Sequence, residues 1–176
     1  MTTTVPPRAF RDAVGEFATG VAVVVVADGD RTAGMTLNSF TSVSLDPLLV
    51  LIALGHGSRT LSLVADTGRF SISILHRSQR DVAIDFAAPG APFPAQHTAA
   101  TADGFVVIAG AASTHHCTVR DRIRAGDHDL VLGHVIGITH MGGEPLVFHR
   151  GKFGGLAPDA LVPPGHPIAL EEGAGW

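Results

Sequence analysis

The chain has 176 residues, of which 45% are apolar, and a formal net charge of −4. This length is typical of one domain with a sizeable core, and a weakly acidic chain without a basic stripe is not expected to bind nucleic acid. The longest uncharged apolar stretches, 20–27 and 48–54, are too short to cross a bilayer, no signal peptide is expected, and the single cysteine, Cys117, fits a reducing cytoplasm.

The N-terminal region is predicted to be a flexible tail, residues 1–7, followed by a helix. Two prolines at the end of the tail mark the helix start. Phe10, Val14 and Phe17 then recur at spacings of four and three among charged residues, which is the pattern of an amphipathic helix. We expect this helix to end near Gly20 and to lie on the surface of a sheet.

A hairpin is predicted next. The β-branched run 21–26 indicates a strand covered on both faces, and Asp28-Gly29 indicates a tight turn. Because side chains alternate along a strand, the return strand has an apolar face and a face of small and polar residues: Thr32, Gly34, Thr36 and Asn38.

The segment 32–47 concentrates uncharged hydrogen-bonding groups, namely Thr36, Asn38, Ser39, Thr41, Ser42 and Ser44. These groups suit a flat ligand with polar edges, because they add no net charge to a pocket. The alternative is an ordinary Ser/Thr-rich loop between two hydrophobic runs. The segment alone does not decide between them.

A second buried strand is predicted over 48–54, followed by a short helix that begins after Ser58 and ends at Gly68. Its apolar stripe comprises Leu61, Val64 and Ala65. Ser58 and Arg59 at its N-terminus form a plausible phosphate cradle, and the alternative is an ordinary cap beside a solvated arginine.

The second half of the chain predicts further strands. A strand over 69–75 precedes a helix whose capping box is 78–81 and whose buried face holds Val82 and Phe86. Residues 87–104 indicate a long irregular connection that acts as a mobile lid. Long strands are predicted at 105–119 and 130–140, joined through the polar segment 120–129, with short strands at 145–148 and 152–153 and a Pro/Gly-rich tail at 157–176.

The fold class that these elements predict is mostly β: an antiparallel barrel of six or more strands, interrupted by short helices. There is no βαβ rhythm, and no G-x-G-x-x-G motif follows a strand, so a Rossmann nucleotide site is not predicted. The high apolar content without a membrane segment indicates that some apolar surface is buried against a second subunit.

The ten histidines invite a metal site, above all at His115-His116-Cys117. Alternation along a strand places His115 and His116 on opposite faces, so the two side chains cannot chelate one ion. No metal site is therefore predicted.

A series of motifs runs in order through most of the chain, from about Phe10 to Leu156: Phe17-Ala18-Thr19-Gly20-Val21, Gly34-Met35-Thr36-x-Asn38-Ser39-Phe40, Ser42-Val43-Ser44-Leu45-Asp46-Pro47, Gly68-x-Phe70, Gln79 with Phe86, Gly126-Asp127-His128 and Pro145-Leu146-x-Phe148-x-x-Gly151. Each motif is weak alone, but their ordered combination resembles the short-chain flavin reductases. These proteins are the reductase partners of two-component flavin-dependent monooxygenases.

The resemblance implies a split-barrel flavin-binding domain over residues 8–156, usually a homodimer. It implies hydride transfer from NADH or NADPH to FMN or FAD, with the reduced flavin released to a partner monooxygenase. Hydride passes directly between the two rings, so the protein needs to stack them and stabilise the developing charge, and no nucleophile is required.

The resemblance also implies site residues. The flavin side is expected to comprise Thr32, Gly34, Met35, Thr36, Asn38, Ser39, Ala53, Leu54, Ser58, Arg59 and Phe86, with Thr36, Asn38 and Ser39 at the polar edge of the ring and Ser58 and Arg59 at the phosphate. The nicotinamide side is expected to comprise His128, Arg150, Gly151 and Phe153. His128 is the candidate contact to the nicotinamide, and the alternative is a turn histidine that holds its loop.

The chain departs from the family pattern at three places: Leu48 replaces a second proline, Ser73 replaces a frequent asparagine, and Lys152-Phe153 replaces an acidic residue and tyrosine. The first two bear on flavin affinity and on the choice between FMN and FAD. A competing interpretation is a non-catalytic or repurposed split-barrel protein that binds flavin without reducing it. A pyridoxamine-phosphate-oxidase-like enzyme is less favoured, because the chain has a single lysine.

Overall fold

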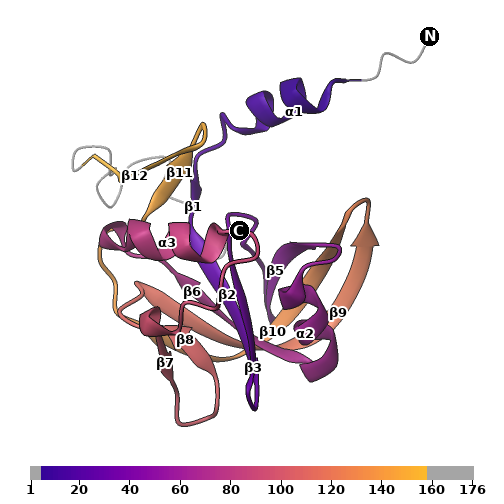
Figure 1. The fold of residues 1–176 in the computed structure, drawn as a ribbon, viewed down its shortest axis with the longest axis vertical. Coiled ribbons are helices and arrows are strands. Elements are labelled where there is room, and N and C mark those ends of the chain that lie inside the picture. Colours follow the sequence, from indigo (N-terminus) through magenta and orange to yellow (C-terminus); the bar gives the residue numbers. More distant parts are fainter. Residues whose placement is uncertain (1–4, 158–176) are drawn as a thin grey trace.

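The computed structural model describes residues 5–157. Residues 1–4 of the predicted N-terminal tail and the predicted C-terminal tail from residue 158 onward lie outside the described residues. The main element of the structure is a seven-stranded antiparallel sheet in the order β3-β2-β6-β9-β10-β5-β4 (Figure 1). The strands of this sheet are β2 (Ala22–Asp28), β3 (Arg31–Leu37), β4 (Thr41–Leu45), β5 (Leu48–Gly55), β6 (Arg69–Ile74), β9 (Ser113–Ala125) and β10 (His128–His140).

The sheet curls round an apolar interior, but its edge strands β3 and β4 are not neighbours in the sheet order. Two small sheets accompany it: β1 (Thr19–Gly20) with β11 (Val147–His149) and β12 (Lys152–Gly154), and β7 (Thr98–Ala100) with β8 (Val106–Ile108). All strand pairs are antiparallel. The predicted class, mostly β with short helices, is confirmed.

Two apolar cores lie on opposite faces of β2. Ala22, Val24 and Val26 pack in one core together with helix α2 (Arg59–Thr67). Val23 and Val25 pack in the other with helix α3 (Arg80–Ala87). The prediction that this strand is covered on both faces is therefore confirmed, because a helix lies against each side of the hairpin's first strand.

The predicted hairpin and the predicted N-cap are both present. Asp28 pairs with Arg31 across a tight turn in which Gly29 has φ +57°. The Ser58 hydroxyl accepts the Leu61 N–H at 3.1 Å, and Gly68 ends α2 with φ +65°. The predicted buried stripe of α2 was wrong at Ala65, which is exposed; Leu63 and Thr60 are buried instead.

The first helix, α1 (Pro7–Val14), differs most from its prediction. It ends at Val14 rather than near Gly20, and none of its residues is buried. Phe10 is 61% and Phe17 77% exposed, and Figure 1 shows α1 projecting away from the sheet. The C-terminal end of the helix is attached to the domain, where Gly15 O accepts the Arg150 N–H at 3.1 Å. Within the described residues, the apolar side of the helix packs on no sheet.

Strand β5 was predicted to be buried throughout, and it is buried on one face only. Val50, Ile52 and Leu54 are buried, whereas the residues between them are partly exposed and Leu48 is 44% exposed. The sheet therefore has an inner and an outer side along this strand.

The turn before α3 also differs. The capping box is formed two residues earlier than predicted, by His76 and Gln79 around the 3-10 turn η1 (Arg77–Gln79), so the box is not 78–81. The connection 87–104 is not wholly irregular, because it contains the 3-10 turn η2 (Ala95–His97) and β7. Because β7 pairs with β8, the backbone of this part of the connection has hydrogen-bond partners.

The predicted strand 105–119 is two strands, β8 and β9, separated by a turn at Gly110, which has φ +68°. The polar segment 120–129 is not a linker, because β9 and β10 stay paired as far as Ala125 and His128. The end of the β9–β10 hairpin extends beyond the core, so the side chains there are exposed and mostly polar. No helix in residues 5–157 is long and apolar enough to cross a membrane.

Candidate functional site

A cavity of about 500 Å³ lies between β3, the start of α2 and the segment that follows α3. We call it the β3–α2 cavity. It is lined by residues 32–36, 57–60 and 85–94. Seven of the predicted flavin-side residues meet here: Thr32, Gly34, Met35, Thr36, Ser58, Arg59 and Phe86.

Strand β3 supplies one wall of the cavity. Ala33 and Leu37 face the core, as the predicted alternation requires, which leaves Thr32, Gly34 and Thr36 for the other face. Thr36 is held in place because its Oγ1 donates a hydrogen bond of 2.7 Å to the carbonyl of Ala83 on α3.

Gly34 permits a close approach that no other residue allows. A Cβ at this position would lie 2.8 Å from the Phe86 ring and 3.0 Å from the Val24 carbonyl oxygen. Because the second contact is with backbone, a side chain at residue 34 would have to displace Phe86 or the strand. The glycine thus lets the phenylalanine ring form the floor beside β3.

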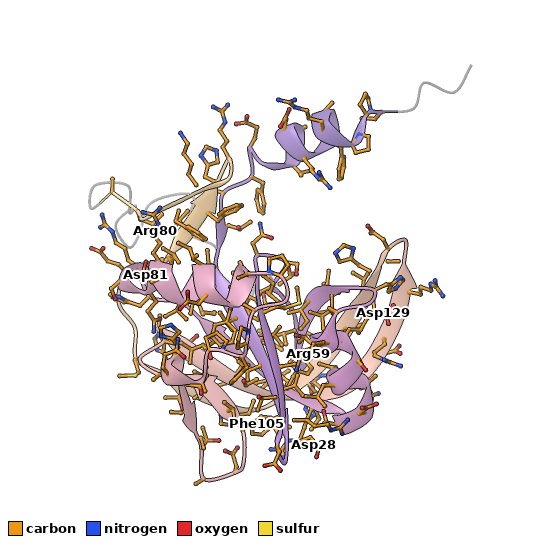
Figure 2. All side chains as sticks on the ribbon, viewed as in Figure 1. Asp28, Arg59, Arg80, Asp81, Phe105 and Asp129 are labelled. Carbon is orange, nitrogen blue, oxygen red and sulfur yellow. The ribbon has the colours of Figure 1, made fainter. Side chains whose placement is uncertain are left out.

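The start of α2 supplies hydrogen-bond donors. Ser58 Oγ caps the Leu61 N–H, while the Arg59 and Thr60 amides have no acceptor within the described part of the chain. Arg59 is the only cationic side chain among the lining residues, and Figure 2 labels it where α2 begins. Free amides at a helix N-terminus together with a guanidinium suit an anion such as a phosphate.

The segment 88–94, which we call the strap, supplies the third wall. Phe93 packs edge-on against Phe86, with ring centroids 5.5 Å apart and an interplanar angle of 84°. Beyond the strap, His97 Nε2 lies 2.7 Å from Asp85 Oδ2, which joins η2 back to α3. The predicted lid is therefore tied at both ends and forms part of the cavity.

Other predicted flavin-side residues lie outside this cavity. Ser39 Oγ donates to the Ala53 carbonyl at 3.3 Å and accepts the Ala53 N–H at 3.0 Å, so these two residues bind each other and join the end of β3 to β5. The Leu54 side chain is fully buried in the core, which keeps it from a ligand.

Three predicted residues line a second cavity, of about 650 Å³, beside α1: Asn38, Arg150 and Gly151. Arg150 donates to Glu16 at 2.8 and 2.9 Å, and this hydrogen bond, with the charge of the guanidinium, lowers the pKa of Glu16. Phe153 packs on Phe148, with centroids 5.4 Å apart.

His128 lies apart from both cavities, at the start of β10 opposite Gly55. Its Nδ1 is 2.7 Å from Asp127 Oδ1, and that hydrogen bond lowers the pKa of Asp127. The Asp127 carbonyl in turn accepts the His56 N–H at 2.9 Å. The residues predicted for the nicotinamide side are thus divided between two places within this chain.

The two adjacent histidines occupy separate environments, as alternation predicted. His115 lies beside Phe40, with ring centroids 5.6 Å apart, and burial lowers its pKa. His116 stacks on Phe105 at 4.4 Å and binds Asp103 through Nδ1 at 2.7 Å. Burial raises the pKa of the neighbouring Cys117 thiol to about 12, so this thiol is unreactive.

The sequence reasoning noted a second hydroxyl at the start of α2 and a lid over 87–104, but it did not include Thr60 or the strap among the site residues. Thr60 is 3% exposed in the first turn of α2, and the signal available in the sequence was its hydroxyl two residues after the capping serine. The strap carried a compositional signal, four prolines and glycines in 88–94, but composition does not show which surface a segment covers.

Comparison with known proteins identifies the family. The model of the flavin reductase like domain matches residues 14–157. A "Probable flavin reductase" of Rhizobium meliloti (strain 1021) is 41% identical over 149 residues, which are 84% of this chain and 48% of that protein. The chain therefore spans about half the length of this relative, and 65% of a second relative from the same organism.

Two further proteins are similar over nearly their whole length. "Flavin-dependent monooxygenase, reductase subunit HsaB" of Mycobacterium tuberculosis is 30% identical over 167 residues, which are 93% of this chain and 89% of that protein. The solved structure of Streptomyces globisporus NADH:FAD oxidoreductase SgcE6, in complex with NAD and FAD fragments, has a TM-score of 0.82 and 36% identity over 90% of this chain and 99% of that chain. The chain belongs to the family of flavin reductase like domains.

Proposed function

We propose that this chain is a flavin reductase that transfers hydride from NADH to FMN or FAD and supplies the reduced flavin to a partner monooxygenase. The observation that carries the proposal is the β3–α2 cavity, whose lining is nearly uncharged except at the start of α2, where Arg59 supplies a positive charge. A flavin has the same division, an uncharged ring system at one end and a phosphate at the other.

The donors and walls of this cavity fit a flavin. Phe86 and the strap offer apolar surface to a planar ring, and Thr32 offers a hydroxyl to its polar edge. The Thr36 hydroxyl donates its proton to Ala83, so its oxygen can only accept from the ring. Asp85 is the one carboxylate in the lining, and it is occupied by His97. The first turn of α2 holds the phosphate through its free amides, Ser58 and Arg59.

When bound, the flavin supplies the ring that accepts hydride from a reduced nicotinamide. The contribution of the chain is to orient that ring against the wall that β3 and Phe86 form together, and to leave one face open to the second substrate. The strap excludes water from the other side of the slot. These roles require no nucleophile and no side chain that exchanges a proton.

The donor and the partner are proposed from the relatives. SgcE6 is named an NADH:FAD oxidoreductase, which favours NADH as the donor here, with NADPH as the alternative. HsaB is named the reductase subunit of a flavin-dependent monooxygenase, which favours an oxygenase as the recipient of reduced flavin. The cytoplasmic location is likewise proposed, on the single cysteine of the chain.

The test is oxidation of NADH and of NADPH by the pure protein with riboflavin, FMN and FAD. We expect turnover with at least one pair and faster turnover with NADH. Absence of turnover with every pair, together with measurable flavin binding, would favour the alternative, a split-barrel protein that binds flavin without reducing it.

His128 keeps two interpretations. A contact to the nicotinamide is the first, and a structural role in the turn is the second; its hydrogen bond to Asp127 and the Asp127–His56 backbone bond support the second. His128→Ala separates them. A raised KM for NADH at unchanged flavin affinity supports the nicotinamide contact, and unchanged kinetics with lower stability support the turn.

We also propose a homodimer. Large apolar side chains stay exposed on α1 and shortly after it, on the β4–β5 edge, and on β10 and directly after it: Phe10, Val14, Phe17, Leu45, Leu48, Ile136, Ile138 and Met141. A second copy of the chain that covers them would also complete the cavity beside α1. Light scattering should give twice the chain mass, and Phe17→Ser with Ile138→Ser should shift it toward the monomer; a monomeric wild type would contradict the proposal.

A further inference from the structure

A third cavity, of about 590 Å³, lies on the hairpin of β9 and β10 and has no assigned role in the proposed reaction. We call it the hairpin cavity. It is lined by His56, Asp121, Arg122, Arg124 and Asp129. Its lining consists entirely of charged or titratable side chains: two arginines, a histidine and two aspartates.

The register of the hairpin explains why three of these side chains, Arg122, Arg124 and Asp129, meet. Arg124 is the cross-strand partner of Asp129, and Arg122 lies two residues along the same strand, so both arginines point to the same face. Asp129 is also the partner of Leu54 on β5, which is buried. The cavity therefore continues the inner side of the sheet beyond the edge of the core.

Both carboxylates of the cavity are already engaged. Asp129 Oδ1 lies 2.7 Å from His56 Nε2, and Asp121 Oδ1 accepts the backbone N–H of Arg122 at 2.7 Å. Within residues 5–157 neither the Arg122 nor the Arg124 guanidinium has a hydrogen-bond or ion-pair partner. Two guanidiniums that face one cavity without a carboxylate partner suit a phosphate.

The hairpin cavity and the β3–α2 cavity are lined by successive residues of the chain. His56 lines the first and Gly57 lines the second, and successive Cα atoms are about 3.8 Å apart. Gly57 has φ +81°, and a Cβ there would meet nothing within 4 Å, so there is open space beside the backbone at this residue.

We propose that Arg122 and Arg124 form a second anion subsite, which binds the phosphate on the adenylate side of FAD. This inference rests on the proposed function, because it assumes that the first flavin phosphate lies at Ser58 and Arg59. FMN ends at that phosphate. In FAD a second phosphate follows and passes over Gly57 to the hairpin cavity, so this subsite makes the protein prefer FAD to FMN.

The experiment is a comparison of FAD and FMN binding to wild-type protein and to the double variant Arg122→Ala with Arg124→Ala, measured by calorimetry. Loss of charge-assisted hydrogen bonds to one phosphate weakens FAD binding by about 10- to 100-fold. The FMN dissociation constant changes less than about twofold, because FMN has no group in this cavity. Arg120→Ala is the matched control, since Arg120 is exposed on the same strand and does not line the cavity.

A second pair of measurements tests whether positive charge in the hairpin cavity is what strengthens FAD binding. Asp121→Asn removes a negative charge that faces the same cavity and keeps the oxygen that accepts the Arg122 N–H, so FAD binding becomes tighter while FMN binding does not. Adenosine 5′-monophosphate displaces FAD from the wild type at lower concentration than from the double arginine variant.

The outcomes distinguish this subsite from the proposed function. Equal changes for FAD and FMN, or no change for either, would overturn the subsite while leaving flavin reduction intact. A raised dissociation constant for NADH with an unchanged one for FAD would also overturn it, and would assign the cavity to the pyridine nucleotide. Failure of the wild type to bind any flavin would contradict the proposed function itself.

Discussion

Helices α1 and α2 are nearly equal in length, and both carry an apolar stripe, yet only the stripe of α2 is buried. Four residues of α2 are buried, whereas none of α1 is. The strands that precede and follow α2 in the sequence, β5 and β6, both belong to the seven-stranded sheet, so α2 is constrained to pack against that sheet. α1 is followed by the short β1 of the small sheet, and within residues 5–157 no strand precedes it. Periodicity thus predicts that a helix has an apolar face, and the connections decide what covers it.

The largest expected effect that tests this contrast is on stability. Leu63→Ala in α2 removes a side chain that is 6% exposed and lowers the free energy of unfolding by about 2–5 kcal/mol. Phe10→Ala in α1 removes a side chain that is 61% exposed, and it changes the free energy of unfolding by less than about 0.5 kcal/mol in the dilute, monomeric protein. Chemical denaturation measures both, and equal losses would show that α1 packs on the domain.

A smaller effect is expected at the start of α2. Ser58→Ala removes the cap on the Leu61 N–H and costs about 0.5–2 kcal/mol of stability. FMN affinity falls as well, because the first turn that holds the phosphate is loosened. Ser62→Ala is the control, since Ser62 is exposed in the same helix and alanine is the better helix former. If both variants behave alike, the cap has no part in holding this turn.

The smallest effect concerns the attachment of α1. Hydrogen bonding and charge from Arg150 lower the pKa of Glu16 below its ordinary value of 4.5. The ion pair therefore contributes fully above pH 4.5 and is lost as the pH falls through the lowered pKa. We expect the Arg150 amide, which donates to Gly15 O, to lose protection from hydrogen exchange below that pH, after correction for the intrinsic rate. Glu16→Gln should remove this pH dependence, and its persistence in the variant would exclude the ion pair as its cause.

Local features could be predicted from the sequence because their causes are local. Asp28-Gly29 allows a two-residue turn, Ser58 caps the helix that follows it, and alternation along β3 separates Thr36 from the core. Each depends on residues at most a few positions apart. The part of the flavin side on β3 and α2 followed from these features together with the family resemblance.

Other features depend on which distant segment arrives next, which no local pattern shows. Ser39 was expected to face a ligand, but the backbone of β5 takes both hydrogen bonds of its hydroxyl. His128 and Arg150 were expected on one side of the site, and the topology places them at different ends of the sheet assembly. The arginines of the hairpin cavity went unnoticed because 120–129 was interpreted as a linker rather than as paired strands.

The central claim is that the first turn of α2 holds the phosphate of a flavin whose ring lies in the β3–α2 cavity. The most direct measurement compares FMN with riboflavin, which lacks the phosphate, in wild-type protein, in Arg59→Ala and in the exposed control Arg80→Ala. The account predicts that Arg59→Ala weakens FMN binding by about 10-fold and leaves riboflavin binding unchanged, which corresponds to about 1.4 kcal/mol on the phosphate alone. Unchanged FMN affinity, or an equal loss for FMN and riboflavin, would contradict it.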